Sequence, residues 1–189
     1  MKIGLYFGSF NPIHTGHCII AHHMATHTDL QQVWLVVSPQ NPFKPAAALL
    51  NEYHRLHLVK TAIEGVSCLK ASDIEFHLPR PSYTIDTLTY LEEKFPQHEF
   101  AVIMGSDGLQ NLHKWKNADK LVTSHDFYVY PRPGFDISTK LPARIQVVKA
   151  PMLDISATEI RKLVREGKDI HFLVPDGVRL EIEKNGYYR

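Results

Sequence analysis

Two histidines and two glycines follow an apolar segment near the N-terminus, in the run Gly8-Ser9-Phe10-Asn11-Pro12-Ile13-His14-Thr15-Gly16-His17. His14 and His17 are three residues apart, so a helix that begins between them would bring both imidazoles toward one point. The N–H groups and the dipole at such a helix start favour an anion. An imidazole can donate a hydrogen bond to an oxygen that gains charge in a transition state. The run therefore predicts a phosphate site, with Gly16 leaving room for a phosphate to approach the backbone.

Two other interpretations of this run stay open. The glycines could simply shape a turn, with the histidines as ordinary surface residues. The segment could also hold zinc, for which imidazole is a common ligand, because it contains His14, His17, His22, His23 and His27. No residue fixes a third ligand, since Cys18 adjoins His17 within an apolar stretch. We therefore assign no metal ligand.

The overall charge of the chain is close to zero. Its 189 residues contain 21 Lys and Arg against 20 Asp and Glu, a formal net charge of +1. This balance provides no general attraction for nucleic acid or for an anionic membrane, so we expect neither as a partner. A chain of this length can bury a core without disulfide or metal support.

The cysteine count and the N-terminus bear on the cellular compartment. Cys18 and Cys68 are too few for a disulfide framework and lack a Cys-x-x-Cys spacing, which fits a reducing interior. Polar residues interrupt the N-terminal segment too soon for a signal peptide. No apolar run approaches the ~20 residues that a membrane-spanning helix requires. We expect a cytoplasmic protein, and the oligomeric state cannot be derived from this pattern.

Six short apolar segments, rich in β-branched and aromatic residues, are expected to form strands. They are 3–7, 33–37, 68–76, 100–104, 127–130 and 145–148. Helical stripes follow Asn51 and Thr84, and the charged tail predicts helices over 155–166 and 177–184. This alternation indicates a Rossmann-like α/β fold, with a doubly wound, mainly parallel sheet. We expect one domain over 1–189 with a small C-terminal helical subdomain from about 151, and a ligand beyond the carboxyl ends of the strands.

Candidate binding residues follow two of these strands. Lys44 stands on a proline-rich loop after the second expected strand, which favours contact with a triphosphate, although a loop lysine is often only solvated. Asp107, which follows Gly105 and the fourth strand, could accept hydrogen bonds from ribose hydroxyls. Ser106 or Asp107 could equally cap the next helix.

The start of the expected 155–166 helix offers a second phosphate contact. Arg161 lies within two turns of that start and carries a planar fork of donors. Ser156 and Glu159 fit a capping box, which explains both residues without a functional role. Arg132, on a proline-flanked loop, is a weaker phosphate or loop-shaping candidate.

Two aromatic positions suit a heterocyclic ligand. Trp115 lies in a mostly polar context, where its indole could stack on a ring or pack partly against the sheet. Ser82 and Thr84 precede a helix and could simply cap it, but capping leaves Tyr83 unexplained.

The motifs together resemble a known family. The pattern Gly-x-Phe-x-Pro-x-His-x-Gly-His after a first strand is similar to the signature of the nucleotidyltransferase superfamily, and the whole chain most resembles its bacterial nicotinate-nucleotide adenylyltransferases. The supporting motifs are Pro39-x-x-Pro42-x-Lys44, Arg80-Pro81-Ser82-Tyr83-Thr84-Ile85-Asp86-Thr87, Gly105-Ser106-Asp107, Trp115, Arg132-Pro133-Gly134 and Ile155-Ser156-Ala157-Thr158-Glu159-Ile160-Arg161.

The resemblance implies a reaction and its site. An enzyme of this kind transfers an adenylyl group from ATP to nicotinate mononucleotide, with Mg²⁺ bridging phosphate oxygens, in a step of NAD biosynthesis. His14 and His17 would be catalytic. The ATP and phosphate contacts would be Gly8, Ser9, Phe10, Gly16, Lys44, Gly105, Asp107, Ile155, Ser156 and Arg161. The acceptor contacts would be Tyr83, Thr84, Trp115 and Lys116. Nearby phosphates should favour the charged imidazolium.

The chain departs from the family pattern at two positions. Ser9 replaces the usual Thr and keeps its hydroxyl, whereas Asn11 replaces the usual Asp and loses a carboxylate. Alternatives to the assigned reaction are the same chemistry on nicotinamide mononucleotide, phosphopantetheine or an alcohol phosphate, a non-catalytic nucleotide-binding module, and a His-rich metal-binding protein.

Overall fold

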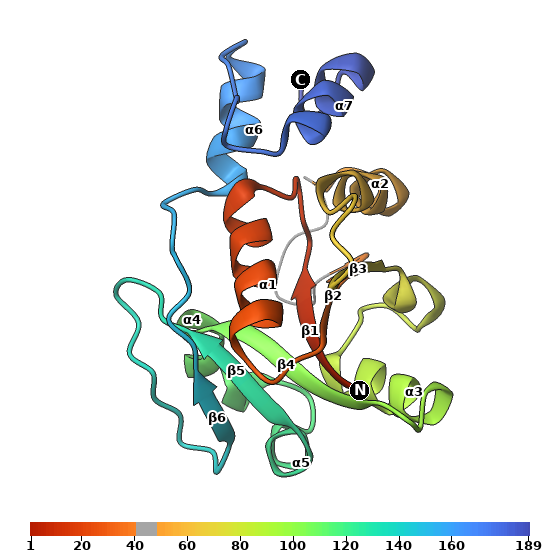
Figure 1. Cartoon of the computed structure of the whole chain (residues 1–189), viewed down its shortest axis with the longest axis vertical. Coiled ribbons are helices and arrows are strands. Elements are labelled where there is room, and N and C mark those ends of the chain that lie inside the picture. The colour runs from red at the N-terminus through yellow and green to blue at the C-terminus, as the bar shows by residue number, and fades with distance from the viewer. Residues whose placement is uncertain (41–48) are drawn as a thin grey trace.

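A six-stranded parallel sheet forms the centre of the molecule in the computed structural model, which describes residues 1–40 and 49–189 (Figure 1). The strand order is β3-β2-β1-β4-β5-β6, and every neighbouring pair is parallel. The strands are β1 (Lys2–Gly8), β2 (Gln32–Val37), β3 (Leu69–Ser72), β4 (Glu99–Gly105), β5 (Asp126–Tyr130) and β6 (Arg144–Val147). Because β1 pairs with β2 on one side and β4 on the other, the order reverses at β1, where α/β sheets open a ligand crevice. The predicted doubly wound α/β fold is confirmed.

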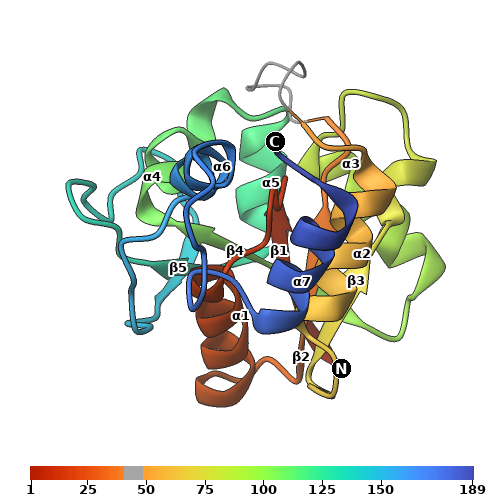
Figure 2. The same cartoon turned by 90° about the horizontal axis from the view of Figure 1, so that it is seen from above.

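Helices cover both faces of the sheet (Figures 1 and 2). The helices are α1 (Thr15–His27), α2 (Glu52–Ala62), α3 (Thr84–Lys94), α4 (Ser106–Gln110), α5 (Ala118–Ser124), α6 (Ala157–Arg165) and α7 (Asp176–Asn185), with short 3₁₀ segments η2 (Ile74–His77) and η3 (Leu112–Lys114). Asn51 caps α2 as expected, since its side-chain oxygen accepts the Tyr53 N–H at 2.9 Å. The expected C-terminal helices form as α6 and α7.

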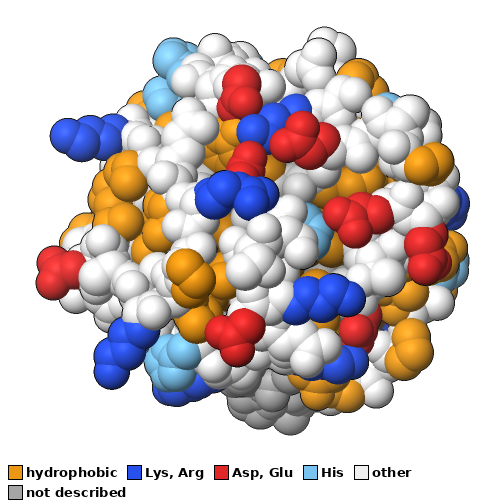
Figure 3. Space-filling model, turned by 90° about the horizontal axis from the view of Figure 1, so that it is seen from below, with side chains coloured by type: hydrophobic (Ala, Val, Ile, Leu, Met, Phe, Trp, Pro, Cys, Tyr) orange, Lys and Arg blue, Asp and Glu red, His pale blue; other side chains and the backbone are white. Residues whose placement is uncertain are grey.

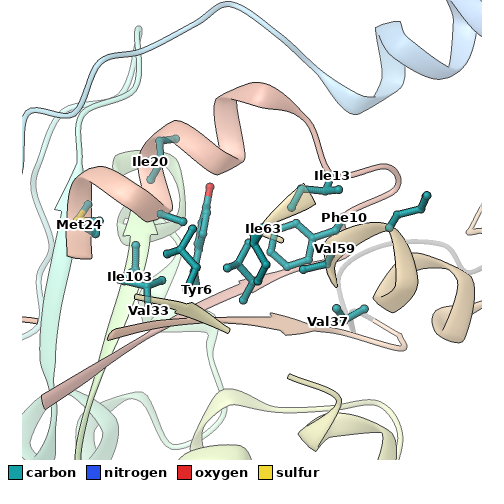
Figure 4. Close-up of a cluster of buried hydrophobic side chains, with 14 of the residues drawn as sticks. Tyr6, Phe10, Ile13, Ile20, Met24, Val33, Val37, Val59, Ile63 and Ile103 are labelled. Atoms are coloured by element: carbon teal, nitrogen blue, oxygen red, sulfur yellow. The ribbon is translucent and has the colours of Figure 1, made fainter. Parts of the chain in front are cut away.

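One buried cluster lies under α1, α2, α6 and α7 (Figure 4). Tyr6 and Val33 reach it from the strands, and Ile20 and Met24 reach it from α1. Side chains of α6 and α7, including Ile182, belong to the same cluster. Seen from above, α7 lies beside α2 (Figure 2). The C-terminal helices therefore share the core of the sheet instead of forming a separate one.

The opposite face carries a second cluster. Ile3 and Leu5 of β1 point to it, because alternate residues of a strand face opposite sides of the sheet. Leu88 and Leu91 of α3 close over these strand residues, and Leu121 of α5 joins them. The sheet is buried on both sides, which explains the continuous apolar runs of its central strands.

The expected strand over 68–76 was wrong in its second half. Strand β3 ends at Ser72, and η2 follows with the Phe76 N–H donating to the Asp73 carbonyl at 2.8 Å. An Asp favours turns because its side chain competes for local hydrogen bonds. The turn sends Ile74 into the second cluster, whereas Leu69 of β3 packs in the first.

The end of the molecule away from α6 and α7 has interspersed acidic and basic side chains (Figure 3). This mixture fits the formal net charge of +1. Within residues 1–40 and 49–189, no helix is both long and apolar enough to cross a membrane.

Candidate functional site

A cleft of about 1050 Å³ opens at the carboxyl ends of the strands, beside the point where the strand order reverses. It brings together most of the residues predicted from the sequence: Gly8, Ser9, Phe10, His14, His17, Tyr83, Thr84, Gly105, Asp107, Trp115, Lys116, Ile155, Ser156 and Arg161. Gly16 is not among the described residues that line it. Lys44 lies outside the described residues. Contacts with a nucleotide remain predictions for all of them.

His14 and His17 hold each other through the start of α1. His14 is the residue before the helix, and its Nδ1 accepts the His17 N–H at 3.4 Å. In return, the His14 N–H donates to Nδ1 of His17 at 3.2 Å. The two rings stack with centroids 3.6 Å apart. Because each Nδ1 accepts a backbone N–H, each neutral ring carries its proton on Nε2.

The cleft holds His14 in its neutral form. Its side chain is almost enclosed, with the residue 8% exposed, and burial lowers its pKa to about 4, with the positive charge of Arg132 acting in the same direction. Protonation would also place a hydrogen on the Nδ1 that accepts the His17 N–H. The imidazolium expected beside bound phosphates stays a prediction, because the pKa of about 4 applies to the cleft of this structure.

The expected open N–H groups at the start of α1 are partly in use. The Thr15 N–H donates to the Leu173 carbonyl at 2.9 Å, and Thr15 Oγ1 donates to the Phe172 carbonyl at 2.9 Å. A Cβ added at Gly16 would lie 3.1 Å from Nδ1 of His14, so a glycine makes room for that imidazole. Contact between Gly16 and a phosphate stays a prediction.

An aromatic wall supports the histidine pair. Phe10 and Tyr6 both meet the His17 ring edge-on, with centroids 5.1 and 6.1 Å away. The hydroxyl groups of Tyr6 and Tyr130 lie 3.2 Å apart at the buried base of this wall. Tyr6, Phe10 and Tyr130 all line the cleft, so the imidazoles stand on a rigid apolar surface.

Trp115 and Tyr83 also line the cleft. Trp115 is partly buried against the second core cluster and also lines the cleft, so it both packs and offers a ring face. Lys116 Nζ lies 4.9 Å from the Tyr83 ring centroid and pairs with Asp86 at 2.7 Å. This arrangement places a cation over the Tyr83 ring.

Simple capping does not explain the residues before α3 and α4. Tyr83 is the cap residue of α3, and no side chain closes that helix start. Gly105 is the cap residue of α4, again with no side-chain bond. Ser106 Oγ instead accepts the Arg132 N–H at 2.8 Å. The capping interpretation of Ser82, Thr84, Ser106 and Asp107 was therefore wrong, whereas Ser156 does cap α6 through the Glu159 N–H at 3.1 Å.

Arg132 lines the cleft, although the sequence analysis gave it only as a weaker phosphate or loop-shaping candidate. Its Nε lies 3.9 Å from the Asp107 carboxylate. Its positive charge is the second cause, after burial, of the lowered pKa of His14. A Cβ added at Gly105 would lie 2.8 Å from Cδ of Arg132, so the glycine admits this side chain. The proline-flanked motif that carries Arg132 was the available signal.

Asn11 links three segments around the histidines. Its side-chain Oδ1 accepts a hydrogen bond from the Leu50 N–H at 3.1 Å. Its backbone carbonyl accepts a hydrogen bond from Nη1 of Arg161 at 2.7 Å. An amide oxygen fulfils the first role as well as a carboxylate oxygen would. The departure from the family pattern at Asn11 therefore preserves this loop contact. Arg161 faces the cleft while tied to the histidine loop.

Glu75 is a buried carboxyl group that the sequence analysis missed. The residue lines the cleft but is only 2% exposed, and burial raises the pKa of its carboxyl group. Its Oε1 accepts the Thr87 hydroxyl at 3.0 Å. Within the described part of the chain, Oε2 of Glu75 and Oγ of Ser82 have no hydrogen-bond partner. The expected strand over 68–76 hid the turn that buries this residue.

The many histidines of the chain do not gather into a metal-binding cluster in the part that the structure describes. Among residues 1–40 and 49–189, no three His, Cys, Asp or Glu side chains are arranged to hold a metal ion. His22 and His27 are exposed along α1, and His23 stacks on His27 with ring centroids 4.0 Å apart.

Comparisons with known proteins agree over nearly the whole chain. Residues 5–163 match the protein family described as Cytidylyltransferase-like. A Flavobacterium johnsoniae protein named "Probable nicotinate-nucleotide adenylyltransferase" is 50% identical, with 100% of both chains covered. A Cytophaga hutchinsonii protein of the same name is 51% identical, with 100% of this chain and 98% of the relative covered.

A solved structure has the same fold. The Plasmodium falciparum nicotinic acid mononucleotide adenylyltransferase complexed with NaAD superposes with a TM-score of 0.84 at 25% sequence identity. The match covers 99% of this chain and 97% of that chain.

Proposed function

The chain belongs to the cytidylyltransferase-like family, among its nicotinate-nucleotide adenylyltransferases, and we propose that it transfers the adenylyl group of ATP to nicotinate mononucleotide. The products are nicotinate adenine dinucleotide and pyrophosphate, in a step of NAD biosynthesis. Relatives of the same name at 50% and 51% identity support this activity.

The stacked imidazoles of His14 and His17 carry the proposal. Reciprocal bonds occupy Nδ1 of both rings, so Nε2 is the nitrogen through which each ring would donate to a phosphoryl oxygen. The capping contacts fix both rings before any ligand arrives, so little reorganisation is needed during reaction. A neutral donor can stabilise the added charge on the α-phosphoryl group without giving up its proton.

The chemistry requires positioning more than proton transfer. An oxygen of the acceptor phosphate forms a bond to the α-phosphorus of ATP, and the bond from that phosphorus to the bridging oxygen of pyrophosphate breaks. The acceptor phosphate is already ionised near neutral pH, so no general base and no covalent enzyme intermediate are needed. Alignment and charge stabilisation then supply the rate.

The two halves of the cleft suit the two substrates. On the ATP side, Arg161 and the capped start of α6 border the histidine loop, where they would hold the leaving phosphates together with Lys44. Asp107 would accept hydrogen bonds from the adenosine ribose. On the acceptor side, Trp115 would stack on the pyridine ring while Tyr83, Thr84 and Lys116 surround the nicotinate end.

Among the residues that the structure describes, the side chains of the cleft do not form a site for Mg²⁺ by themselves. Glu75 is buried with a raised pKa, and Asp107 faces Arg132, so neither of these carboxyl groups is a ready ligand. Mg²⁺ commonly binds through substrate phosphates with few protein ligands. When bound with the triphosphate, Mg²⁺ would neutralise part of the phosphate charge.

Pyrophosphate release tests the proposed function. Purified protein is incubated with ATP and Mg²⁺, and with nicotinate mononucleotide, nicotinamide mononucleotide or phosphopantetheine as the acceptor. We expect rapid release with nicotinate mononucleotide and much slower release with the other two. Faster turnover of either competitor would reassign the acceptor, and no release with any of the three would indicate a binding module.

A further inference from the structure

Arg55 of α2 is a buried cation placed behind the cleft. The residue is 1% exposed, and burial lowers the pKa of its guanidinium. It donates to four backbone carbonyls: Leu50 at 2.7 Å, Ser9 at 2.5 Å, Ser38 at 2.8 Å and Pro39 at 3.2 Å. Burying a charge is costly unless hydrogen bonds compensate it, so this side chain is held by the loops that it joins.

The four carbonyls belong to segments that the sequence separates. Ser9 follows β1, Ser38 and Pro39 follow β2, and Leu50 precedes the cap of α2. The Nη1 atom alone donates to both Ser9 and Ser38. The planar guanidinium therefore fixes the loop after β1 relative to the loop after β2, because its donors have a rigid geometry.

The bond to Ser9 also orients the next backbone N–H. The Ser9–Phe10 peptide is trans, so its carbonyl and its N–H point in opposite directions. With the Ser9 carbonyl turned back to Arg55, the Phe10 N–H is turned away from Arg55. Phe10 has a φ of +46°, a left-handed conformation that a bulky residue adopts only when its surroundings impose it.

We propose that Arg55 is a positioning residue for nucleotide binding. By holding the Ser9 carbonyl, it presents the Phe10 N–H to a phosphate oxygen of ATP and seats the Phe10 ring against His17, whose centroid is 5.1 Å away. Arg55 itself does not line the cleft among the residues described there. The inference deepens the proposed function and rests on it for the identity of the nucleotide.

The kinetic test compares Arg55→Met and Arg55→Lys with the wild type. Arg55→Met should lower kcat/KM for ATP by about 10²-fold, the loss expected when a reacting geometry shifts by about 1 Å. Arg55→Lys keeps the charge without the planar fork of donors, so its kcat/KM for ATP should lie between those of Arg55→Met and the wild type. Calorimetric binding of nicotinate mononucleotide should stay at the wild-type affinity, because Arg55 touches none of the acceptor residues.

A spectroscopic readout separates this inference from the proposed activity. In protein labelled with ¹⁵N-phenylalanine, the Phe10 amide is identified by its loss in a Phe10→Leu variant. Addition of α,β-methylene ATP, which cannot transfer its adenylyl group, should shift that amide in the wild type and not in Arg55→Met. This result would stand even if pyrophosphate release showed that the proposed reaction is wrong.

Tyr128→Phe is the matched control for a loss of stability. It removes the hydroxyl that donates to Asp29 at the amino ends of the strands, on the other side of the sheet from the cleft loops.

If Arg55→Met lowers ATP and acceptor affinity equally, or only in proportion to the unfolded fraction, Arg55 merely stabilises the fold. If Arg55→Met does not fold, Arg55→Lys decides the question. A wild-type kcat/KM for ATP and a wild-type Phe10 shift in that variant would overturn the proposal.

Discussion

Charged groups have different surroundings at the two ends of the parallel strands. We call the side with the carboxyl ends of the strands the carboxyl edge and the side with their amino ends the amino edge. At the carboxyl edge, burial disfavours ionisation, so the pKa of His14 falls to about 4 and the pKa of Glu75 rises. Arg55 there donates to carbonyls, and burial lowers its pKa as well. Burial at this edge therefore disfavours the charged forms of these three groups.

At the amino edge, ionised groups pair with one another. Lys2 Nζ lies 3.0 Å from both Asp29 and Asp126, and Arg144 lies 2.6 Å from Asp126. Burial opposes the charge of Lys2, but hydrogen bonds with Tyr128 and the two aspartates outweigh it and raise the pKa of the ammonium. A bond from the Tyr128 hydroxyl lowers the pKa of Asp29, and a bond from Arg144 lowers that of Asp126.

The difference separates function from stability. Groups that already have charge partners can contribute to folding but have little left for a ligand. Groups whose charged form is disfavoured at the cleft keep donors and acceptors ready for the charges of a substrate. Substitutions at the carboxyl edge should therefore change turnover, and substitutions at the amino edge should change only stability.

The largest effect is expected for His17→Ala. Loss of one donor to a developing oxyanion costs about 10²- to 10³-fold in kcat, while ATP affinity should change little. The measurement is steady-state pyrophosphate release at saturating ATP. His22→Ala, on the exposed face of the same helix, is the control and should keep wild-type turnover. Near-normal turnover in His17→Ala would remove the catalytic role and weaken the contrast between the two edges.

Trp115→Ala should come next. Stacking of a base on an aromatic ring contributes about 1–3 kcal/mol, so the acceptor KM should rise about 10- to 100-fold with a smaller change in kcat. Trp115→Phe retains a ring face and should recover part of this loss. An acceptor KM that stays at the wild-type value in Trp115→Ala would show that the indole serves packing alone.

His14 should make stability depend on pH at the carboxyl edge. Its folded pKa of about 4 lies below the ordinary 6.5, so the unfolded chain binds the proton first and stability falls as the pH drops from 6.5 toward 4. The shift corresponds to up to about 3 kcal/mol over that range. His14→Asn keeps a helix-capping side chain without the titration, and urea unfolding at several pH values should show a flatter profile. A parallel pH dependence in both proteins would contradict the neutral state of His14.

Tyr128→Phe should have the smallest effect, confined to stability. Removing one hydrogen bond to a carboxylate costs about 1.5–3 kcal/mol at most, and exposure of Asp29 reduces that figure. Thermal unfolding measures the loss, and pyrophosphate release should remain unchanged. A clear loss of turnover at equal folded fraction would show that the two edges are coupled.

The fold was predictable because buried parallel strands are recognisable as apolar runs. The segments 33–37 and 100–104 lie within β2 and β4, and the family and enzyme class inferred from the spaced motifs were confirmed by the comparisons. Most of the predicted site residues line one cleft, although their individual roles remain predictions. Lys44 lies outside the described residues.

The remaining features depend on contacts that spacing does not reveal. Arg55 joins carbonyls up to 46 residues away in the sequence, and an arginine on an otherwise apolar helix face was the only signal. Glu75 was hidden by a turn inside an expected strand. The neutral state of His14 depends on its enclosure and on Arg132, far along the chain.

The bonds from Thr15 to the carbonyls of Phe172 and Leu173 join α1 to a segment 157 residues further along the chain. During synthesis on the ribosome, α1 emerges early, but its partners at Phe172 and Leu173 do not yet exist. The start of this helix can complete its contacts only after Phe172 and Leu173 have been synthesised. The backbone that surrounds the histidine pair is thus completed long after the pair itself has been synthesised.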